Sequence, residues 1–297
     1  MLRIGWNGSL GRSVASLVVN RAVDAEGTTE VVASAEDRPW VARLRASAAE
    51  RALARLAHRT GVPGAVVLVL LGVGAVVAFA GFGFAVALED VMEGDGVVGA
   101  DPAVQRFLVE HRTTGLTDVF RVITRLGGPG VIITLALVVA LLLVWRHHRV
   151  LAFGLVVATL GTALLVAVVK LLVDRSRPPP LDRLAVATGA SFPSGHSAEA
   201  IAFYGALAWI VVELVRGRRS RMLVCAGAIM LGLAIGFSRA YLGVHWASDV
   251  LSGWLLGLGW LAATIGLCAL VPTMLEQSRG RGERQQVGVS ADASRPA

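Results

Sequence analysis

Three short stretches of the sequence carry side chains that could do chemistry together. They are KLLVDRSRP at residues 170–178, SFPSGHSAE at residues 191–199 and SRAYLGVHWASD at residues 238–249. Arginine binds oxyanions such as phosphate through paired planar donors, and lysine adds a point charge. The stretches therefore predict an oxyanion pocket with two imidazoles, built from Lys170, Arg177, Ser194, Gly195, His196, Arg239, His245 and Asp249.

Lys170 is the only lysine among the chain's 28 basic residues. Chance in an arginine-rich sequence would explain its presence, and so would the reach of a long amine from a helix end to a membrane interface. The alternative is that this position needs an ammonium group for an anion. That alternative depends on whether the other two stretches point to the same anion.

The residues Pro193 to His196 have the form of a turn that leads into a helix. The start of a helix presents free backbone N–H groups and a positive dipole end, which together bind anions. Gly195 lets the backbone come close to such an anion, and the Ser194 hydroxyl adds a donor. The second stretch therefore points to the same oxyanion as the cations.

His245 and Asp249 are four residues apart, so on a helix their side chains share a face. A carboxylate that holds one imidazole nitrogen fixes the tautomer and leaves the other nitrogen free to attack. His196 is then available as a general acid or base. Each motif alone has a structural explanation, as a helix start, a snorkelling side chain or an interfacial bond. Their joint occurrence at the ends of apolar segments favours function, because ionisable residues at membrane depth are costly.

The elements that must position these residues are apolar helices. Hydrophobic residues make up 55% of the 297 residues and charged residues only 16%, which is too apolar for an ordinary soluble domain. A helix needs roughly 20 apolar residues to cross a hydrocarbon core. The sequence therefore predicts an all-α, polytopic integral membrane protein with about six transmembrane helices in one bundle. The six candidate segments lie within residues 60–88, 126–145, 150–169, 198–215, 222–237 and 250–275.

Polar segments flank the predicted six-span membrane domain, residues 61–275, which carries the phosphate-binding residues. Residues 1–60 form a leader without a cleavable signal peptide, and residues 38–59 have the pattern of a basic amphipathic helix on a membrane surface. A solvated helix without a role explains that pattern equally well. Residues 276–297 form a polar tail that we expect to be disordered.

Basic residues are unevenly divided between the two sides of the predicted bundle. Nineteen arginines lie in the leader, the tail and the loops at 146–149 and 216–221. Nine basic residues lie in the other loops, at 89–126, 170–197 and 238–249. The side with more basic residues is normally cytoplasmic. We therefore expect a multi-pass protein of the cell membrane with both termini in the cytoplasm and all three motif stretches facing outside.

The other polar residues suggest no second site. Glu199 has the place of a favourable charge in the first turn of a helix, although it could also pair with His196. Cys225 and Cys268 fall inside apolar spans, where we expect small core residues. No cluster has metal-ligand spacing, and no basic stripe interleaved with aromatic residues suggests nucleic acid, so we expect no metal, no cofactor and no nucleic-acid partner. Four histidines are expected to be structural: His58, His111, His147 and His148.

The three motifs together resemble the signature of the type 2 phosphatidic acid phosphatases, also called lipid phosphate phosphatases. That signature reads K-x6-R-P, then P-S-G-H, then S-R-x5-H-x3-D, and every fixed position is met in order and spacing. The similarity runs from about residue 99 to residue 270 and includes the stretches ITRLGGPG and GVHWASDVLSGWLLG. Soluble vanadate-dependent haloperoxidases share this pocket, but the six predicted spans argue against their activity here.

The resemblance implies a role for each site residue. His245 would be the nucleophile that forms a phosphohistidine, Asp249 would orient it, and His196 would protonate the leaving alkoxide. The family works without a metal. The phosphoryl oxygens would be held by Lys170, Arg177, Ser194, Gly195 and Arg239.

Three functions are consistent with the sequence. The favoured one is hydrolysis of a lipid phosphate or diphosphate, such as phosphatidate, phosphatidylglycerophosphate or a polyprenyl diphosphate. Transfer of the phosphoryl group to a lipid or sugar acceptor would use the same intermediate, so the motifs do not separate these two. A non-enzymatic lipid-binding protein is the third, and loss of a histidine or a basic ligand would have favoured it. The partners implied are the lipid phosphate substrate and membrane lipids, while the oligomeric state is left open.

Overall fold

The computed structural model describes residues 64–293, with side chains for residues 66–271. The predicted leader, with its amphipathic helix at residues 38–59, lies outside the described residues. The chain divides into two compact units, residues 1–70 and 71–297, and the second holds every element below except the first turns of α3. All regular elements within residues 64–293 are helical, which confirms the predicted all-α class.

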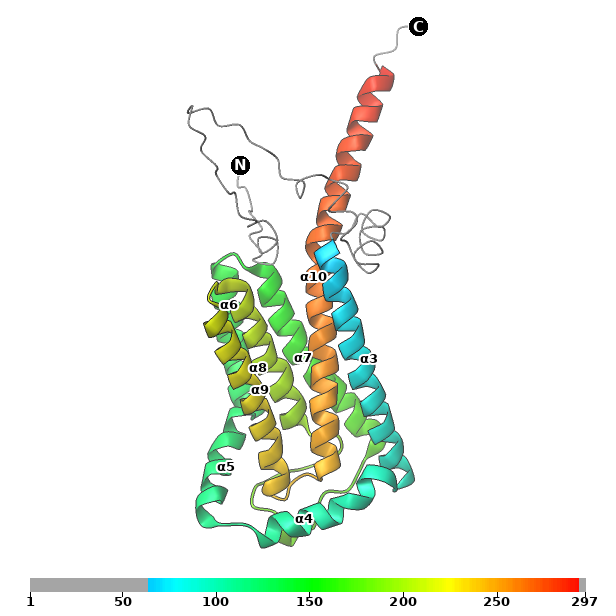
Figure 1. Cartoon of the computed structure of the whole chain (residues 1–297). Helices are drawn as coiled ribbons and strands as arrows, with labels where there is room; N and C mark the ends of the chain where they lie inside the picture. Colours follow the sequence, from blue (N-terminus) through cyan, green and yellow to red (C-terminus); the bar gives the residue numbers. More distant parts are fainter. Residues whose placement is uncertain (1–63, 294–297) are drawn as a thin grey trace, which may run out of the picture. The chain divides into compact units, whose positions relative to one another are not determined.

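The elements follow the chain in a simple order (Figure 1). Two short 3-10 turns, η2 and η3, lie in the connections that follow α3 and α7. The elements are α3 (Gly64–Glu93), η2 (Gly96–Ala100), α4 (Asp101–Glu110), α5 (Thr114–Leu126), α6 (Pro129–Trp145), α7 (Arg149–Val173), η3 (Pro180–Asp182), α8 (Gly195–Leu214), α9 (Arg218–Tyr241) and α10 (Ala247–Ala293).

Five of these helices, α3, α7, α8, α9 and α10, are long and apolar enough to cross a membrane. α6 has only 17 residues and extends about 25 Å, which is short for a span. α5 and α6 pass the same test together, with a bend of 43° between them. Gly128 caps α6 and Pro129 begins it, where the missing N–H of proline breaks no helical bond. The protein is an integral membrane protein in which five described helices can span the membrane, and the bent pair of α5 and α6 would make the sixth predicted span.

α8 is the central helix of the second unit, because it packs against α7, α9 and α10. The core around it contains small and aliphatic side chains such as Ala136, Leu155, Ala158 and Ala206, together with Phe203. Lipid tails are as apolar as leucine, so transmembrane helices associate through close packing of small residues and not through the hydrophobic effect. The alanine-rich interior follows from this requirement.

A close approach of two helix backbones joins α8, which begins in the second motif stretch, to α10, which begins in the third. A Cβ at Gly253 of α10 would lie 2.5 Å from the carbonyl oxygen of Ser194, and one at Gly257 would overlap the backbone of Ala198. Only glycine lets the two backbones come this close. The amide of Ser194 consequently donates to the carbonyl oxygen of Asp249 at 3.0 Å, which fixes the start of α8 on the first turn of α10.

The connection between α4 and α5 is tied to the end of α9. Arg112 donates from Nε and Nη2 to the carbonyl oxygen of Tyr241, at 3.0 and 2.8 Å. The amide of Thr113 donates to the Tyr241 hydroxyl at 3.2 Å. These bonds hold the turn that follows α9, in which the third motif stretch continues.

The polar end of the chain differs from the sequence prediction. The backbone of α10 continues as a helix to Ala293, whereas a disordered tail was expected from residue 276. No proline interrupts residues 273–293, and Glu, Gln and Arg are good helix formers. Extending an existing helix costs far less than starting one, so this composition allows α10 to propagate beyond its apolar part.

Candidate active site

The helix ends that carry the motif residues lie together at one end of the bundle (Figure 1). Lys170 is in the last turn of α7, Ser194 is the N-cap residue of α8, and Arg239 is in the last turn of α9. Asp249 is in the first turn of α10. The structure thus brings together the residues that the sequence placed in three separate stretches.

His245 lies in the short connection between α9 and α10, and its side chain is buried. Gly243 allows this connection to turn, because its φ is +73° and a Cβ there would collide with the carbonyl oxygen of Asp182. The amides of Val244 and His245 both donate to the carbonyl oxygen of Arg239, at 3.1 and 3.3 Å. The backbone itself therefore fixes the place of the imidazole.

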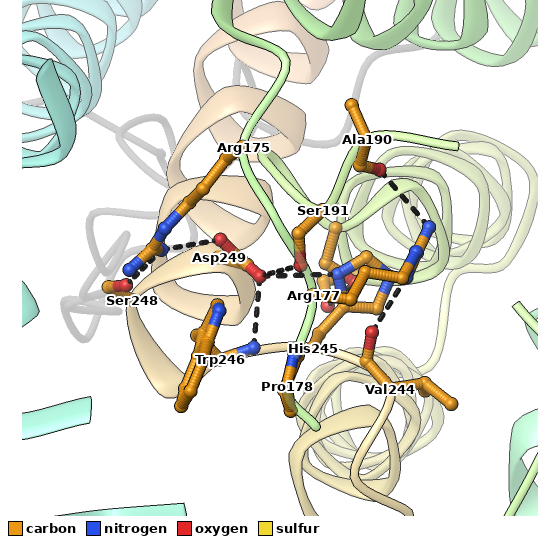
Figure 2. A network of polar contacts seen from close by, with 12 residues as sticks. Arg175, Arg177, Pro178, Ala190, Ser191, Val244, His245, Trp246, Ser248 and Asp249 are labelled. Carbon is orange, nitrogen blue, oxygen red and sulfur yellow. Dashed lines mark hydrogen bonds and ion pairs between the residues drawn. The ribbon is translucent and has the colours of Figure 1, made fainter. Parts of the chain in front are cut away.

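The two nitrogens of the His245 ring have different neighbours (Figure 2). Nε2 lies 3.1 Å from Nη1 of Arg177. A guanidinium can only donate, so Nε2 accepts and the ring proton is on Nδ1. Nδ1 lies 3.4 Å from Oδ2 of Asp249, within ion-pair distance but without the geometry of a hydrogen bond. This is the tautomer that a nucleophilic Nε2 requires.

The surroundings of His245 keep its ring neutral. Burial lowers the pKa of His245 to about 4; Asp249 opposes this effect, and the charges of Arg177 and Arg239 reinforce it. Near pH 7 the imidazole therefore keeps a lone pair on Nε2, which accepts from Arg177 and which a protonated ring would lack. Such a ring can act as a nucleophile.

Three consecutive carbonyl groups, at residues 188–190, hold two cations of the first motif stretch, Lys170 and Arg177. Arg177 donates to all three, at 2.9, 2.9 and 3.1 Å, and its Nη1 also reaches the carbonyl oxygen of Val244 at 2.6 Å. Lys170 Nζ donates to the carbonyl oxygen of Ala190 at 2.5 Å. These acceptors are neutral, so a phosphoryl oxygen would offer both cations a stronger, charge-assisted partner.

Arg239 is buried, with 5% of its surface exposed. Its Nη1 donates to Oγ1 of Thr124 at 2.8 Å. Its Nε is one of three buried side-chain nitrogens within the described residues that have no hydrogen-bond partner. A buried donor without an acceptor costs roughly 1–3 kcal/mol. This position would therefore be stabilised by a bound acceptor such as an oxyanion.

The start of α8 supplies the second imidazole. His196 is the second residue of α8 and lies within electrostatic range of Arg239 and His245. A Cβ added at Gly127 would lie 3.6 Å from Cδ2 of His196, so the break between α5 and α6 forms the wall beside this ring. Ser194 is buried, and its Oγ accepts a hydrogen bond from Ser197 at 2.8 Å. Its own hydroxyl proton therefore stays free for an acceptor.

Comparison with known proteins decides the family. The family model described as the PAP2 superfamily matches residues 149–269. Phosphatidylglycerophosphatase B of Bacillus subtilis (strain 168) is 31% identical over 181 residues, which are 60% of this chain and 87% of that protein. The chain belongs to the PAP2 superfamily.

Two further PAP2-type comparisons agree. The undecaprenyl-diphosphatase of Sulfolobus acidocaldarius is 31% identical over 130 residues, which are 42% of this chain and 58% of that protein. The crystal structure of a transmembrane PAP2-type phosphatidylglycerolphosphate phosphatase from Bacillus subtilis has a TM-score of 0.60 and 27% identity, and the match covers 64% of this chain and 94% of that one. The expected resemblance, the transmembrane fold and the assignment as a phosphatase are confirmed. The family model begins at residue 149, so the similarity expected from about residue 99 extends beyond its match.

Four residues that bind the predicted site residues directly or through Arg175 were not predicted from the sequence: Asp101, Thr124, Arg175 and Ser191. Figure 2 shows two of them, Arg175 and Ser191, on Asp249. Arg175 Nη1 lies 2.6 Å from Asp249 Oδ1, and Ser191 Oγ donates to Asp249 Oδ2 at 2.5 Å. Arg175 occupies an open position of the pattern K-x6-R-P, and Ser191 and Thr124 lie inside stretches that the resemblance already quotes. Asp101 precedes a proline at a helix start, a pattern that indicates capping and nothing more.

A polar cavity of about 340 Å³ lies beside Arg177. Its lining suits water and phosphate better than an acyl chain. No three His, Cys, Asp or Glu side chains among the described residues gather to hold a metal ion, and metal independence stays a prediction to be tested. The cavity is lined by Asp174, Arg175, Ser176, Arg177, Arg183, Ala187, Gly189 and Ala190.

Proposed function

We propose that this PAP2 protein hydrolyses the phosphomonoester or diphosphate of a membrane lipid through a phosphohistidine on His245. The observation that carries the proposal is a neutral His245 whose Nε2 faces Arg177, next to a buried Arg239 whose Nε lacks an acceptor. A nucleophile and cationic donors with capacity for an oxyanion therefore meet at one point. Phosphoryl transfer depends on this combination.

In the first step, the lone pair of His245 Nε2 would form a bond to phosphorus while the bond to the leaving oxygen breaks. His196 would give that oxygen its proton. Arg177 would exchange Nε2 and its carbonyl partners for the phosphoryl oxygens, which Lys170 and Arg239 would also bind. Asp249 would stabilise the positive charge that appears on the imidazole ring.

In the second step, a water oxygen would bond to phosphorus and the phosphorus–nitrogen bond of His245 would break. His196 would take the proton from that water. The products would be inorganic phosphate and a lipid alcohol, or a lipid monophosphate if the substrate is a diphosphate. The imidazole of His245 would return to its neutral form.

The relatives suggest the substrate classes. One is named a phosphatidylglycerophosphatase and the other an undecaprenyl-diphosphatase. Both names refer to the terminal phosphoryl group of a membrane lipid, which is the group that His245 would attack. We propose phosphatidylglycerophosphate, phosphatidate and polyprenyl diphosphates as candidate substrates of this chain.

We also propose that the pocket faces the outside of the cell membrane, with both termini in the cytoplasm. The proposal rests on the nineteen arginines of the leader, tail and loops at 146–149 and 216–221, against nine basic residues in the three other loops. The meeting of all three motif stretches at one end of the bundle is consistent with a single exposed side (Figure 1).

A phosphate-release assay on the purified full-length protein in detergent tests the function. The substrates are phosphatidate, phosphatidylglycerophosphate and undecaprenyl diphosphate, each with and without EDTA. We expect release of inorganic phosphate from at least one lipid, unchanged by EDTA and inhibited by vanadate, which adopts the five-coordinate geometry of phosphoryl transfer. A strict magnesium requirement would contradict the mechanism, and release that appears only with a lipid or sugar acceptor would identify a phosphotransferase instead.

A further inference from the structure

Arg175 joins two buried carboxylates. Its Nη1 lies 2.6 Å from Oδ1 of Asp249, and its Nη2 lies 2.7 Å from Oδ2 of Asp101. The Arg175 side chain is 12% exposed, that of Asp101 is 3% exposed and that of Asp249 is fully buried. One cation thus lies between two anions, and removing any one of the three would leave a buried charge without full compensation.

Asp249 uses its two oxygens for different partners (Figure 2). Oδ1 accepts from Arg175, whereas Oδ2 accepts from Ser191 Oγ at 2.5 Å and from the amide of Trp246 at 2.9 Å. Oδ2 also faces Nδ1 of His245. Because Arg175 holds Oδ1, rotation of the carboxylate would break an ion pair, and Oδ2 stays directed at the imidazole.

Asp101 fixes the other end of Arg175. It is the first residue of α4, in a part of the chain that the family model does not match. Its Oδ1 accepts from the amide of Ser248 at 3.0 Å, and its Oδ2 accepts from Ser248 Oγ at 2.5 Å. Ser248 is the neighbour of Asp249 in the first turn of α10. Asp101 therefore holds Arg175 and the start of α10 in one arrangement.

We propose that Arg175 is a positioning residue for the reaction and that Asp101 holds it in place for this role. Arg175 acts on Asp249, and through Asp249 on His245. Asp101 has a second effect, because it shares the charge of Arg175. Asp249 then keeps enough negative charge to stabilise the imidazolium that forms when His245 is phosphorylated. The inference rests on the proposed function, since it needs His245 to be the nucleophile.

A direct role of Arg175 as a phosphate ligand is the competing explanation, because Arg175 also lines the polar cavity next to Arg177. Both terminal nitrogens of Arg175 already bind carboxylates. Arg177 by contrast is held by neutral carbonyl groups and by His245 Nε2. An incoming phosphoryl group would therefore draw Arg177 from its partners more readily than Arg175 from two anions.

The test is a double-mutant cycle on the full-length enzyme in detergent. The rate of phosphoenzyme formation with an activated aryl phosphate is measured for wild type, Arg175→Gln, Asp249→Ala and the double variant, together with steady-state kcat and KM. Arg175→Gln should slow phosphoenzyme formation roughly 10–100-fold with little change in KM, as loss of an outer partner does for metal-bound histidines. In the Asp249→Ala background the same substitution should change the rate by less than about threefold, because Arg175 then has no group to act through.

Three further variants complete the test. Arg175→Lys keeps the charge but only part of the geometry, so its loss should be intermediate, and it serves if Arg175→Gln does not fold. Asp101→Asn should also lower kcat without raising KM. Arg121→Gln is the matched control, since it removes an arginine of α5 whose partner Asp118 is 64% exposed. Its rate should equal that of wild type, and thermal unfolding of every variant separates loss of fold from loss of rate.

The outcomes are distinct. A raised KM, or an Arg175→Gln effect that persists in the Asp249→Ala background, would identify Arg175 as a phosphate ligand and overturn the inference. So would an active wild type whose Arg175→Gln and Arg175→Lys variants keep the full rate. If the wild type releases no phosphate from any substrate, the proposed function itself fails.

Discussion

The cations of the candidate site differ in the hydrogen-bond partners that they would exchange when a phosphoryl group binds. Lys170 and Arg177 would give up neutral carbonyl partners, whereas the Nε of Arg239 would gain its first partner. A charged acceptor makes stronger hydrogen bonds than a carbonyl, so all three exchanges favour binding. The single lysine fits this arrangement, because its compact ammonium reaches the Ala190 carbonyl without the five donors of a guanidinium that would each need an acceptor.

Replacement of the two histidines should affect turnover and phosphoenzyme formation differently. His245→Ala should abolish both turnover and phosphoenzyme, because the attacking nitrogen is lost. His196→Ala should slow turnover about 10²–10⁴-fold, as expected for loss of a general acid and base. With an activated aryl phosphate, whose leaving group needs no proton, the first step should partly survive in His196→Ala and phosphoenzyme should accumulate. Acid-labile, base-stable radiolabel on the protein measures it.

Reversal of this pattern would exchange the two roles. If His245→Ala still forms a phosphoenzyme and His196→Ala does not, the nucleophile is His196. Asp249→Asn offers a matched control, because it keeps the shape of the side chain and removes its charge. It should form phosphoenzyme at a reduced rate, since the imidazole of His245 loses its orienting anion. Its thermal midpoint should fall, because the largely buried Arg175 then keeps only Asp101 as a charged partner.

At the scale of elements, the side chain of Asp249 both caps the start of α10 and faces the ring of His245. The Asp249 carboxylate accepts the amide of Trp246 at 2.9 Å and so caps the start of the helix, and it also faces the ring of His245. The end of α5 and the break before α6 also position site residues. Thr124 holds Arg239, and Gly127 lies beside His196 and leaves room for Ile235 of α9, whose Cγ2 an added Cβ would overlap. Helix starts and breaks position the site, while the long apolar parts of the helices hold these ends in place.

A glycine at the contact between α8 and α10 should therefore tolerate substitution less well than a helical glycine elsewhere. Gly253→Ala would put a methyl group 2.5 Å from the carbonyl oxygen of Ser194, so the two backbones must separate. We expect at least a tenfold loss of kcat and a lower thermal midpoint in detergent. Gly227→Ala in α9 is the control, because a Cβ there meets nothing within 4 Å. It should keep full activity and gain up to about 1 kcal/mol of stability from the better helix propensity of alanine. Equal activity of the two variants would show that this contact does not position the site.

At the scale of the whole molecule, the features that could be predicted were those encoded locally. Apolar runs predicted six spans, and residues at fixed spacing predicted which helix ends would meet. The partners of Asp249 could not be predicted in this way. Arg175 lies 74 residues from Asp249, and Asp101 lies 147 residues from Ser248, so no periodicity connects them. The bend between α5 and α6 was missed because its glycines and proline stand at the start of an apolar run, where they resemble a helix start.

Orientation in the membrane is the remaining property of the whole chain, and labelling with an impermeant thiol reagent tests it. Single cysteines are introduced at Ser9, Ala103 or Val186 in a variant that lacks Cys225 and Cys268. Ala103 lies in α4, and Val186, which is 93% exposed, lies in the loop that carries the carbonyl groups around Arg177. With cytoplasmic termini, intact cells should be labelled at positions 103 and 186 and not at position 9, while lysed cells should be labelled at all three. The reason is the excess of arginines in the leader, the tail and the loops at 146–149 and 216–221, which should retain those segments in the cytoplasm. Labelling of intact cells at position 9 alone would place the pocket on the cytoplasmic side, and its lipid phosphate would then have to come from the inner leaflet.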